Sequence, residues 1–384
     1  MRHEDSSFSH VPQGYEASPE HYQKLLQQKE EEVEKLKRQM SDLELRKAQV
    51  PRIDEKLESS YFECVIPRKV MVYCKPFDDD VIFSFMRLYK YMEESHPGIA
   101  IYVDEWVIDE IRKVQESEAC EGEDVCEGVF LPNVFVNTGE EVRKEIDYII
   151  TLGGDGTILW ASKQFRRCHF PPLISFAHGS LGYMCNFEFE EHPHILEQVF
   201  SDQECNLHLD NRLRLKCEVL GQDQREVYRG NNFTQSETMS IKDFHVINEI
   251  VIDRGPSPYS LQLEIYFDGV YMTTLIGDGL IISTPNGSTA YNLSAGGSIV
   301  QSNCQCICLT PLAPHSLSFR PLIIPINTTI TLKKPDDNRN SAWVSLDGAT
   351  RFELGDAENF EVKGSQSCIS MVVNPSDNLT ELWG

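Results

Sequence analysis

Short apolar runs alternate with amphipathic stretches between residues 61 and 206. The apolar runs have the length of buried strands, and apolar residues three and four apart in the stretches between them are typical of helices. The predicted strands are residues 68–74, 99–103, 146–152 and 173–176, and the predicted helices are residues 80–95, 104–114 and 157–166. This alternation predicts an α/β domain over 61–206, built on a parallel sheet that is covered on both faces.

The pattern changes after residue 207, where the helical periodicity fades. The apolar segments become short and β-rich, and Gly, Pro, Asn or Asp separates one from the next. They are residues 212–220, 245–254, 260–267, 279–283, 328–333 and 342–346. We therefore expect a second, β-rich domain of stacked sheets, similar to a sandwich, over 207–371. A tail follows over 372–384, and its return to the α/β domain is one option.

Residues 1–60 are interpreted as an N-terminal extension. The stretch 21–49 contains no Pro or Gly, and its apolar residues form one stripe at helical spacing: Tyr22, Leu26, Val33, Leu36, Met40 and Leu43. This spacing predicts a helix over 21–49. The helix is either a coiled coil of about three heptads or a helix that packs on its own protein.

Charge and cysteine content limit the class of function. The chain has 35 Lys and Arg residues against 60 Asp and Glu residues, which gives a formal net charge of −25. This excess of acid argues against a nucleic-acid binder, because neutralising phosphates needs clustered Lys and Arg. We expect no membrane span, since no apolar run reaches ~18 residues. Without an apolar signal segment, the 12 cysteines are expected to be reduced thiols of a cytoplasmic protein.

The glycine-rich loop Gly153-Gly154-Asp155-Gly156-Thr157 lies between a predicted strand and a predicted helix. Glycines at the carboxyl end of a parallel strand let backbone N–H groups approach an anion, and the following helix N-terminus adds its dipole. A carboxylate does not favourably contact a phosphate, so Asp155 is expected either to hold Mg²⁺ or to take a proton from an attacking hydroxyl. Both roles belong to phosphoryl transfer, and a tight turn without a ligand is the alternative.

Two further segments carry polar residues beside apolar strands. Residues 277–297 contain a predicted strand, a turn rich in Ser, Thr, Asn and Gly, and then an expected helix. Backbone amides and hydroxyls at such a turn suit ribose, phosphate or adenine edges.

The pair Asn248 and Glu249 interrupts the predicted strand 245–254, and an Asn beside a Glu suits the vicinal diol of a ribose. Two side chains on opposite faces of a strand are the alternative.

In this order and spacing, the 153–157 loop, the Asn248–Glu249 pair and the 277–291 stretch resemble the NAD kinase family. The resemblance covers roughly residue 67 to the C-terminus. It implies an N-terminal α/β domain, a C-terminal β-rich domain, and transfer of the ATP γ-phosphate to the 2′-hydroxyl of the adenosine ribose of NAD or NADH. It also implies Mg²⁺ held mainly by the ATP phosphates, and a homo-oligomer, dimer or tetramer, whose NAD site is completed across a subunit boundary.

The resemblance assigns roles to the matching residues. Asp155 matches the catalytic Asp, which is expected to orient and deprotonate the ribose hydroxyl. Asn248 and Glu249 match an NAD-contacting pair, and Asp278 would face the nicotinamide side. The other nucleotide-binding candidates are Gly153, Gly154, Gly156 and Thr157 in the loop, Ser283, Thr284, Gly287, Ser288 and Ser294 in the second segment, Thr289, Ala290 and Tyr291 around the adenine, Tyr183 as a pocket wall or a core residue, and Asp347 in a late Asp-Gly turn.

Two other functions stay open at this point. The Gly-Asp loop also resembles that of diacylglycerol and sphingosine kinases, although the polar run 283–291 suits a ribose better than an acyl chain. A nucleotide sensor without turnover is the other alternative, which the presence of Asp155 disfavours. Dehydrogenase and Walker-type chemistry are not expected, because neither glycine signature occurs.

Cys304, Cys306 and Cys308 are interpreted as one face of a buried strand rather than a metal site. Residues 116–128 are interpreted as an exposed loop.

Overall fold

A computed structural model of the chain describes residues 66–116, 131, 133–137, 140–165, 169–179, 182–201, 207–220, 225–229, 235–316, 319–335, 341–356 and 358–374. The predicted helix 21–49, nearly all of the loop 116–128 and the last ten residues of the tail lie outside these ranges. What we expect of them stays a prediction.

The first sheet is built on five parallel strands in the order β3-β2-β1-β4-β5. Their bounds are β1 Lys69–Cys74, β2 Ala100–Val103, β3 Val134–Val136, β4 Tyr148–Leu152 and β5 Leu173–Ala177, and β6 (Phe187–Glu188) pairs with the end of β5. Strands β4 and β5 are buried at every residue, as expected for parallel strands with helices on both faces.

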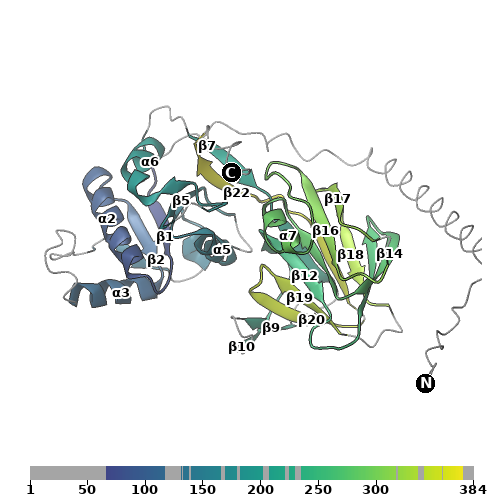
Figure 1. Ribbon diagram of the computed structural model, residues 1–384. Coiled ribbons are helices and arrows are strands. Elements are labelled where there is room, and N and C mark those ends of the chain that lie inside the picture. The colour runs from purple at the N-terminus through teal and green to yellow at the C-terminus, as the bar shows by residue number, and fades with distance from the viewer. Residues whose placement is uncertain are drawn as a thin grey trace, which may run out of the picture. The chain divides into compact units, whose positions relative to one another are not determined.

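Helices cover the two faces of this sheet unequally. On one face lie α2 (Asp79–Ser95), α3 (Glu105–Glu116) and α6 (His192–Val199), preceded by the turn η2 (Phe189–Glu191), and on the other lies α5 (Asp155–Gln164) (Figure 1). A short α4 (Glu140–Arg143) precedes β4. Alternation along β1 explains the two cores, since Val70 and Val72 pack towards α2 whereas Met71 and Tyr73 pack towards α5. The predicted parallel sheet covered on both faces is confirmed.

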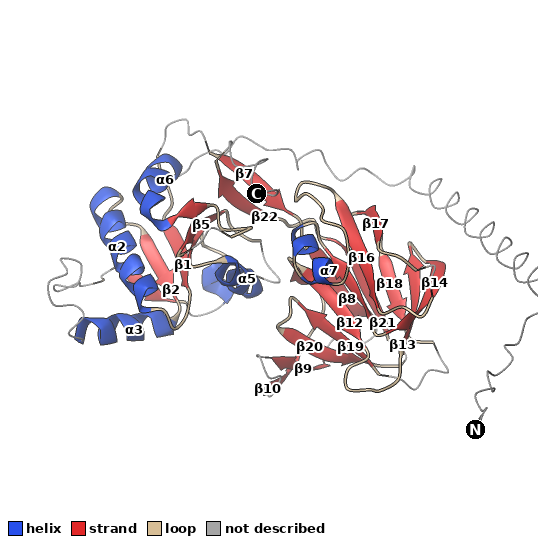
Figure 2. Cartoon of the chain, in the orientation of Figure 1, coloured by secondary structure: helices blue, strands red, loops and turns tan. Residues whose placement is uncertain are grey.

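The rest of the described chain consists almost entirely of strands in two antiparallel sheets (Figure 2). The first has the order β10-β9-β20-β19-β12-β15-β16-β17 and the second the order β11-β8-β21-β18-β13-β14. The bounds are β8 Leu215–Leu220, β9 Arg225–Arg229, β10 Gln235–Met239, β11 Phe244–Val246, β12 Glu249–Asp253, β13 Leu261–Phe267, β14 Val270–Gly277, β15 Gly279–Ser283, β16 Cys306–Leu312, β17 Leu322–Pro325, β18 Ile330–Lys333, β19 Ala342–Leu346, β20 Thr350–Leu354 and β21 Asn359–Gly364. The β-rich part is therefore confirmed.

Two strands from outside the first segment complete the first sheet. β22 (Ile369–Val373) pairs parallel with β5 and antiparallel with β7 (His208–Arg212). The expected domain boundary before residue 207 and the expected start of the tail at residue 372 therefore differ from the structure. The chain stays in the first sheet until Arg212 and returns to it at Ile369. A return of the chain to the α/β domain was one option for the tail, whereas the largely polar β7 lacks the alternation that predicts a strand.

Several local predictions need correction. The predicted strand 245–254 is two strands, β11 and β12, interrupted where Asp347 binds the backbone N–H groups of residues 247–249. The run 212–220 is likewise divided between β7 and β8, and the helix predicted from 157 begins at Asp155. The helix expected after the 283–291 turn is a 3₁₀ turn, η3 (Asn286–Thr289), and one helical turn, α7 (Tyr291–Ser294). Cys304 is exposed and lies before β16, so only the other two cysteines of the trio are buried on the strand.

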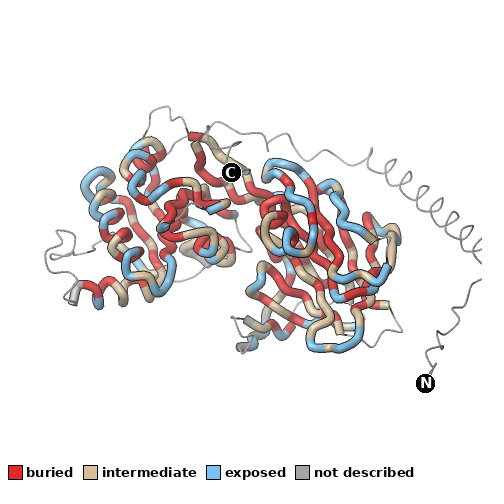
Figure 3. The backbone as a smooth tube through the Cα atoms, viewed as in Figure 1, coloured by how far each residue is buried: buried red, intermediate tan, exposed pale blue. Residues whose placement is uncertain are grey.

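Burial follows the strands of all three sheets and the helix faces turned towards them, while the outer helix faces are exposed (Figure 3). The longest described helix, α2, has 17 residues, and its buried residues include Val81, Phe85, Leu88 and Met92 at helical spacing. Within the part of the chain that the structure describes, no helix has the length and apolar content to cross a membrane.

Candidate active site

The glycine-rich loop lies where β4 ends and α5 begins, at the carboxyl edge of the first sheet. Gly153 has a φ of 147°, and a Cβ on it would lie 2.4 Å from Thr157 Oγ1, so the position needs glycine. Gly154 is the N-cap residue of α5 and provides no side-chain cap. The N-terminus of α5 therefore has no side-chain cap, and an uncapped helix N-terminus is a typical anion site.

Asp155 is the first residue of α5, and its carboxylate is held by the turn formed by residues 182–184. Its Oδ2 accepts a hydrogen bond from the Tyr183 backbone N–H and its Oδ1 accepts one from the Met184 backbone N–H, both at 3.0 Å. Gly182 makes this approach possible, because a Cβ there would lie 2.2 Å from Oδ1. The two bonds fix the half-buried carboxylate in one orientation and leave acceptor positions for a further donor.

Asp347 holds the Asn248–Glu249 pair in place. It lies in the turn after β19 with a φ of 45°. Its carboxylate accepts hydrogen bonds from the backbone N–H groups of Ile247 at 3.1 Å, Asn248 at 2.8 Å and Glu249 at 3.3 Å. The Asp347 side chain therefore holds the backbone of the pair in place.

Glu249 carries a buried carboxylate with spare acceptor capacity. Burial, and after it the Asp347 carboxylate, raises the pKa of Glu249 to about 7, although a hydrogen bond from the Tyr291 backbone opposes the rise. Its Oε2 is buried and has no hydrogen-bond partner among the described residues. A buried oxygen without a partner is unfavourable, and a ligand hydroxyl would supply one.

Most of the hydroxyl groups predicted in residues 277–297 to bind the nucleotide donate hydrogen bonds within the protein. Ser283 donates to the Thr284 carbonyl, Thr284 to that of Ile247, and Ser288 to that of Val300. Gly287 packs against the pair, since a Cβ there would lie 2.2 Å from the Asn248 carbonyl oxygen. These buried residues shape the turn, and the predicted binding residues that stay half-buried or exposed at its surface are Thr289, Ala290, Tyr291 and Ser294.

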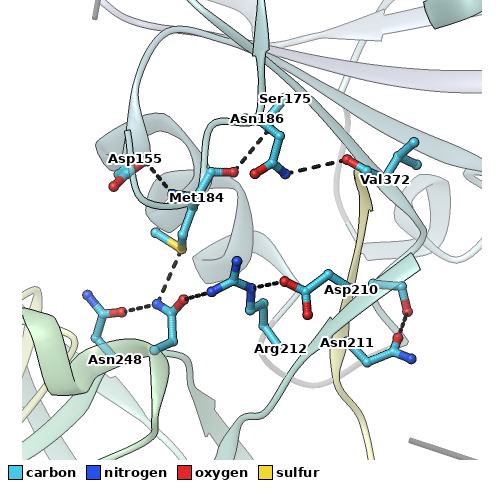
Figure 4. A network of polar contacts seen from close by, with 11 residues as sticks. Asp155, Ser175, Met184, Asn186, Asp210, Asn211, Arg212, Asn248 and Val372 are labelled. Carbon is cyan, nitrogen blue, oxygen red and sulfur yellow. Dashed lines mark hydrogen bonds and ion pairs between the residues drawn. The ribbon is translucent and has the colours of Figure 1, made fainter. Parts of the chain in front are cut away.

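Two residues that the sequence analysis missed connect the pair to Asp155. Asn286 Nδ2 donates to Asn248 Oδ1 at 2.7 Å, and Asn286 Oδ1 accepts from Arg212 Nη1 at 3.3 Å. The same Nδ2 lies 3.3 Å from Sδ of Met184, whose N–H binds Asp155 (Figure 4). Asn286 stands inside the polar 283–291 turn, which was a usable signal. Arg212 lies on a polar strand whose pattern gave none.

Asp278 does not join this network. It immediately precedes β15, whereas Thr284, after the other end of β15, bonds to the backbone of Asn248. The five strand residues between them, at about 3.3 Å each, separate Asp278 from the pair within one chain. Its half-exposed carboxylate instead lies 3.0 Å from Arg254 Nε.

A cavity of about 700 Å³ opens beside the glycine-rich loop. Its lining includes Gly154, Gly156 and Thr157 of the loop and α5, together with Lys75, Phe77, Trp106 and Trp160. Phe77 and Trp160 are also exposed, which is unusual for large apolar side chains next to a polar loop. These four residues were not predicted, because they come from three separate elements that only the sheet brings together.

The described ranges contain no group of three or more His, Cys, Asp or Glu side chains arranged to hold a metal ion. Cys306 and Cys308 are buried with Val300 in a small apolar cluster, in agreement with the interpretation of these two as strand residues.

Sequence models of one family match both halves of the chain. The ATP-NAD kinase N-terminal domain matches residues 70–205 and the ATP-NAD kinase C-terminal domain matches residues 247–373. The NAD(+) kinase of Saccharomyces cerevisiae is 37% identical over 288 residues, which are 74% of this chain and 53% of that protein. The chain thus spans about half the length of this relative.

Solved structures agree with these matches. The crystal structure of yeast NADH kinase complexed with NADH has a TM-score of 0.65 and 29% identity, and the match covers 82% of this chain and 85% of that one. An NAD kinase from Archaeoglobus fulgidus in complex with ATP has a TM-score of 0.55 at 18% identity, with 82% and 97% covered, and supports the fold. The resemblance noted in the sequence is confirmed, and the chain belongs to the ATP-NAD kinase family.

Proposed function

We propose that this chain is an NAD kinase, which transfers the γ-phosphate of ATP to the 2′-hydroxyl of the adenosine ribose of NAD or NADH. Relatives named NAD(+) kinase and NADH kinase support the substrate class. The observation that carries the proposal is the Asp155 carboxylate, which two backbone N–H groups hold beside the α5 N-terminus and connect, through Met184 and Asn286, to the Asn248–Glu249 pair. The family assignment gives no support to the lipid kinase alternative.

Asp155 would act as the general base. The 2′-hydroxyl oxygen attacks the γ-phosphorus, its proton passes to the Asp155 carboxylate, and the bond from this phosphorus to the bridging oxygen breaks with ADP as the leaving group. The carboxylate is suited to this role because its two hydrogen bonds come from fixed backbone donors. It therefore needs little reorientation when the hydroxyl arrives.

The donor would occupy the cavity beside the glycine-rich loop. The first N–H groups of α5 and the Lys75 ammonium supply positive charge for phosphates, and Phe77, Trp106 and Trp160 supply flat apolar surface for a base. Mg²⁺ would enter this site with the donor and be held mainly by its phosphates, since the described residues offer no cluster of three or more His, Cys, Asp or Glu side chains. When bound, the ion would neutralise charge on the phosphates.

NAD would lie against Asn248, Glu249 and the surface of the second segment, with Thr289, Ala290, Tyr291 and Ser294 around its adenine end. Asp278 lies at the other end of β15, and we place it against NAD bound by a second copy of the chain in a homo-oligomer. A cytoplasmic location completes the proposal.

Replacing Asp155 with Asn tests the base directly. Asp155→Asn removes the proton acceptor but keeps the shape, so kcat is expected to fall by about 10²–10⁴-fold while NAD affinity stays within about threefold. NADP formation from NAD and MgATP measures turnover, and calorimetry measures NAD binding. Asp109→Asn, the same change on the exposed face of α3, serves as the control and should retain wild-type turnover. Near-normal turnover of the Asp155 variant would remove this residue from the mechanism.

Trp160 tests the donor cavity. Truncating this exposed side chain in Trp160→Ala should cost about 1–3 kcal/mol of stacking with a base, which corresponds to a rise in KM for ATP of about 5- to 150-fold. NAD affinity should not change, because Trp160 lines the donor cavity and is not among the NAD contacts proposed above. Steady-state kinetics with each substrate varied separately gives both values. Tyr259→Ala removes another exposed aromatic ring as a control, and an unchanged KM for ATP in Trp160→Ala would exclude the cavity as the base site.

Glu249 predicts a pH dependence of NAD binding. The ionised carboxylate accepts hydroxyl hydrogens at both oxygens, and its pKa of about 7 makes this form scarce below pH 7 and dominant above it. Wild-type affinity for NAD is therefore expected to rise about tenfold from pH 6 to pH 8. Glu249→Gln does not titrate and should bind weakly with a flat profile, whereas Glu264→Gln should keep the wild-type profile. Calorimetry at three pH values measures this, and a wild-type slope in Glu249→Gln would refute the assignment.

A further inference from the structure

Arg212 is a buried cation between the two groups of proposed site residues. It is 7% exposed, and its Nε lies 2.7 Å from Asp210 Oδ2 on the same strand. Its Nη1 donates to Asn286 Oδ1 at 3.3 Å, and its guanidinium carbon lies 5.1 Å from the centre of the Tyr183 ring. In Figure 4 the guanidinium points from β7 towards the contacts that lead to Asn248, with Asp210 on its other side. The function proposed above gives no role to Arg212 and uses Asn286 only as the contact between Met184 and Asn248.

The direction of these hydrogen bonds follows from chemistry. A guanidinium group only donates, so the amide oxygen of Asn286 must face Arg212 and its NH₂ group must face away. That NH₂ group reaches Asn248 Oδ1 at 2.7 Å and the Met184 sulfur at 3.3 Å. A thioether only accepts, so Arg212 and Met184 independently require the same orientation of the Asn286 amide.

This orientation determines which group Asn248 presents. Its oxygen is used by Asn286, which leaves its NH₂ group without a hydrogen-bond partner among the described residues. The next residue, Glu249, contributes an oxygen that lacks a partner. The pair therefore presents one donor beside one acceptor. A reversed Asn248 amide would instead place two oxygens side by side, one of them on a carboxylate.

We propose that Arg212 is a positioning residue that fixes the Asn248 amide, through Asn286, with its NH₂ group towards the bound dinucleotide. The same guanidinium packs on Tyr183, whose backbone N–H holds Asp155, so it also contacts the support of the base. This inference rests on the proposed function, because it concerns how that site recognises NAD. It adds Asp210, Arg212 and Asn286 to the residues that determine NAD affinity.

Asn286→Asp is the most direct test. A carboxylate at this position still accepts from Arg212 but cannot donate to Asn248, so the Asn248 amide should turn and present its oxygen to the ligand. NAD affinity should fall at least tenfold, while KM for ATP stays near the wild-type value and the melting temperature is retained. Asn303→Asp, the same change at an exposed turn, is the matched control and should bind NAD normally.

A double-mutant cycle with Asn248→Ala separates positioning from a general loss of structure. Without the Asn248 amide there is nothing to turn, so Asn286→Asp should add less than a twofold loss in that background. Arg212→Gln is the second variant, to be used if Asn286→Asp does not fold. Its amide can accept as well as donate, and it should weaken NAD binding with the same dependence on Asn248.

The outcomes distinguish this inference from the proposed function. If the wild-type chain neither binds nor phosphorylates NAD, the proposed function fails and the inference fails with it. If the wild-type chain binds NAD but the variants bind equally well, or weaken binding equally with and without the Asn248 amide, the positioning role is wrong while the function stands.

Discussion

The two hydrogen bonds that backbone N–H groups donate to the Asp155 carboxylate are the contact on which the rest of the proposed site depends. It exists because β4 and β5 are parallel neighbours, which brings the segments after their carboxyl ends to one edge of the sheet. The segment after β4 supplies Asp155, and the segment after β5 supplies the 182–184 turn. Long-range strand pairing thereby fixes an acid that would otherwise rotate in solvent.

A second carboxylate acts in the same way in the β-rich part, with a different result. Strands β19 and β12 are neighbours, and Asp347 after β19 binds three consecutive N–H groups at the start of β12. Three donors use most of the capacity of that carboxylate, so it serves as a support. Among the described residues, Asp155 accepts two such bonds, and these leave room for a substrate hydroxyl. The Asp155 carboxylate thus keeps more acceptor capacity than that of Asp347 towards the described residues, which agrees with the role proposed for it.

The sequence predicted the fold where periodicity was strong, and it predicted the position of the glycine-rich loop between a strand and a helix, because the need for glycine there is local. The strand and helix alternation up to β5 and the loop around Gly153 depend on neighbours in the chain, so they could be read directly. It failed where distant residues decide the outcome. Asp347 breaks the strand before Glu249 from about a hundred residues away, and the hydroxyls of Ser283 and Ser288 turn inwards to backbone partners. The contact of Arg212 with Asn286 has no periodic signature at all.

Gly182 provides the most direct test of the central claim, that the fixed orientation of Asp155 makes it an effective base. Its φ lies outside the left-handed region, so alanine is compatible with the backbone. The three heavy atoms nearest to the added Cβ would all belong to the Asp155 carboxylate, with Oδ1 at 2.2 Å. The decisive measurement is the rate of NADP formation from NAD and MgATP by Gly182→Ala, with NAD affinity measured alongside. We expect kcat to fall about a hundredfold with little change in NAD affinity. Wild-type turnover in this variant would show that the orientation of Asp155 does not determine the rate.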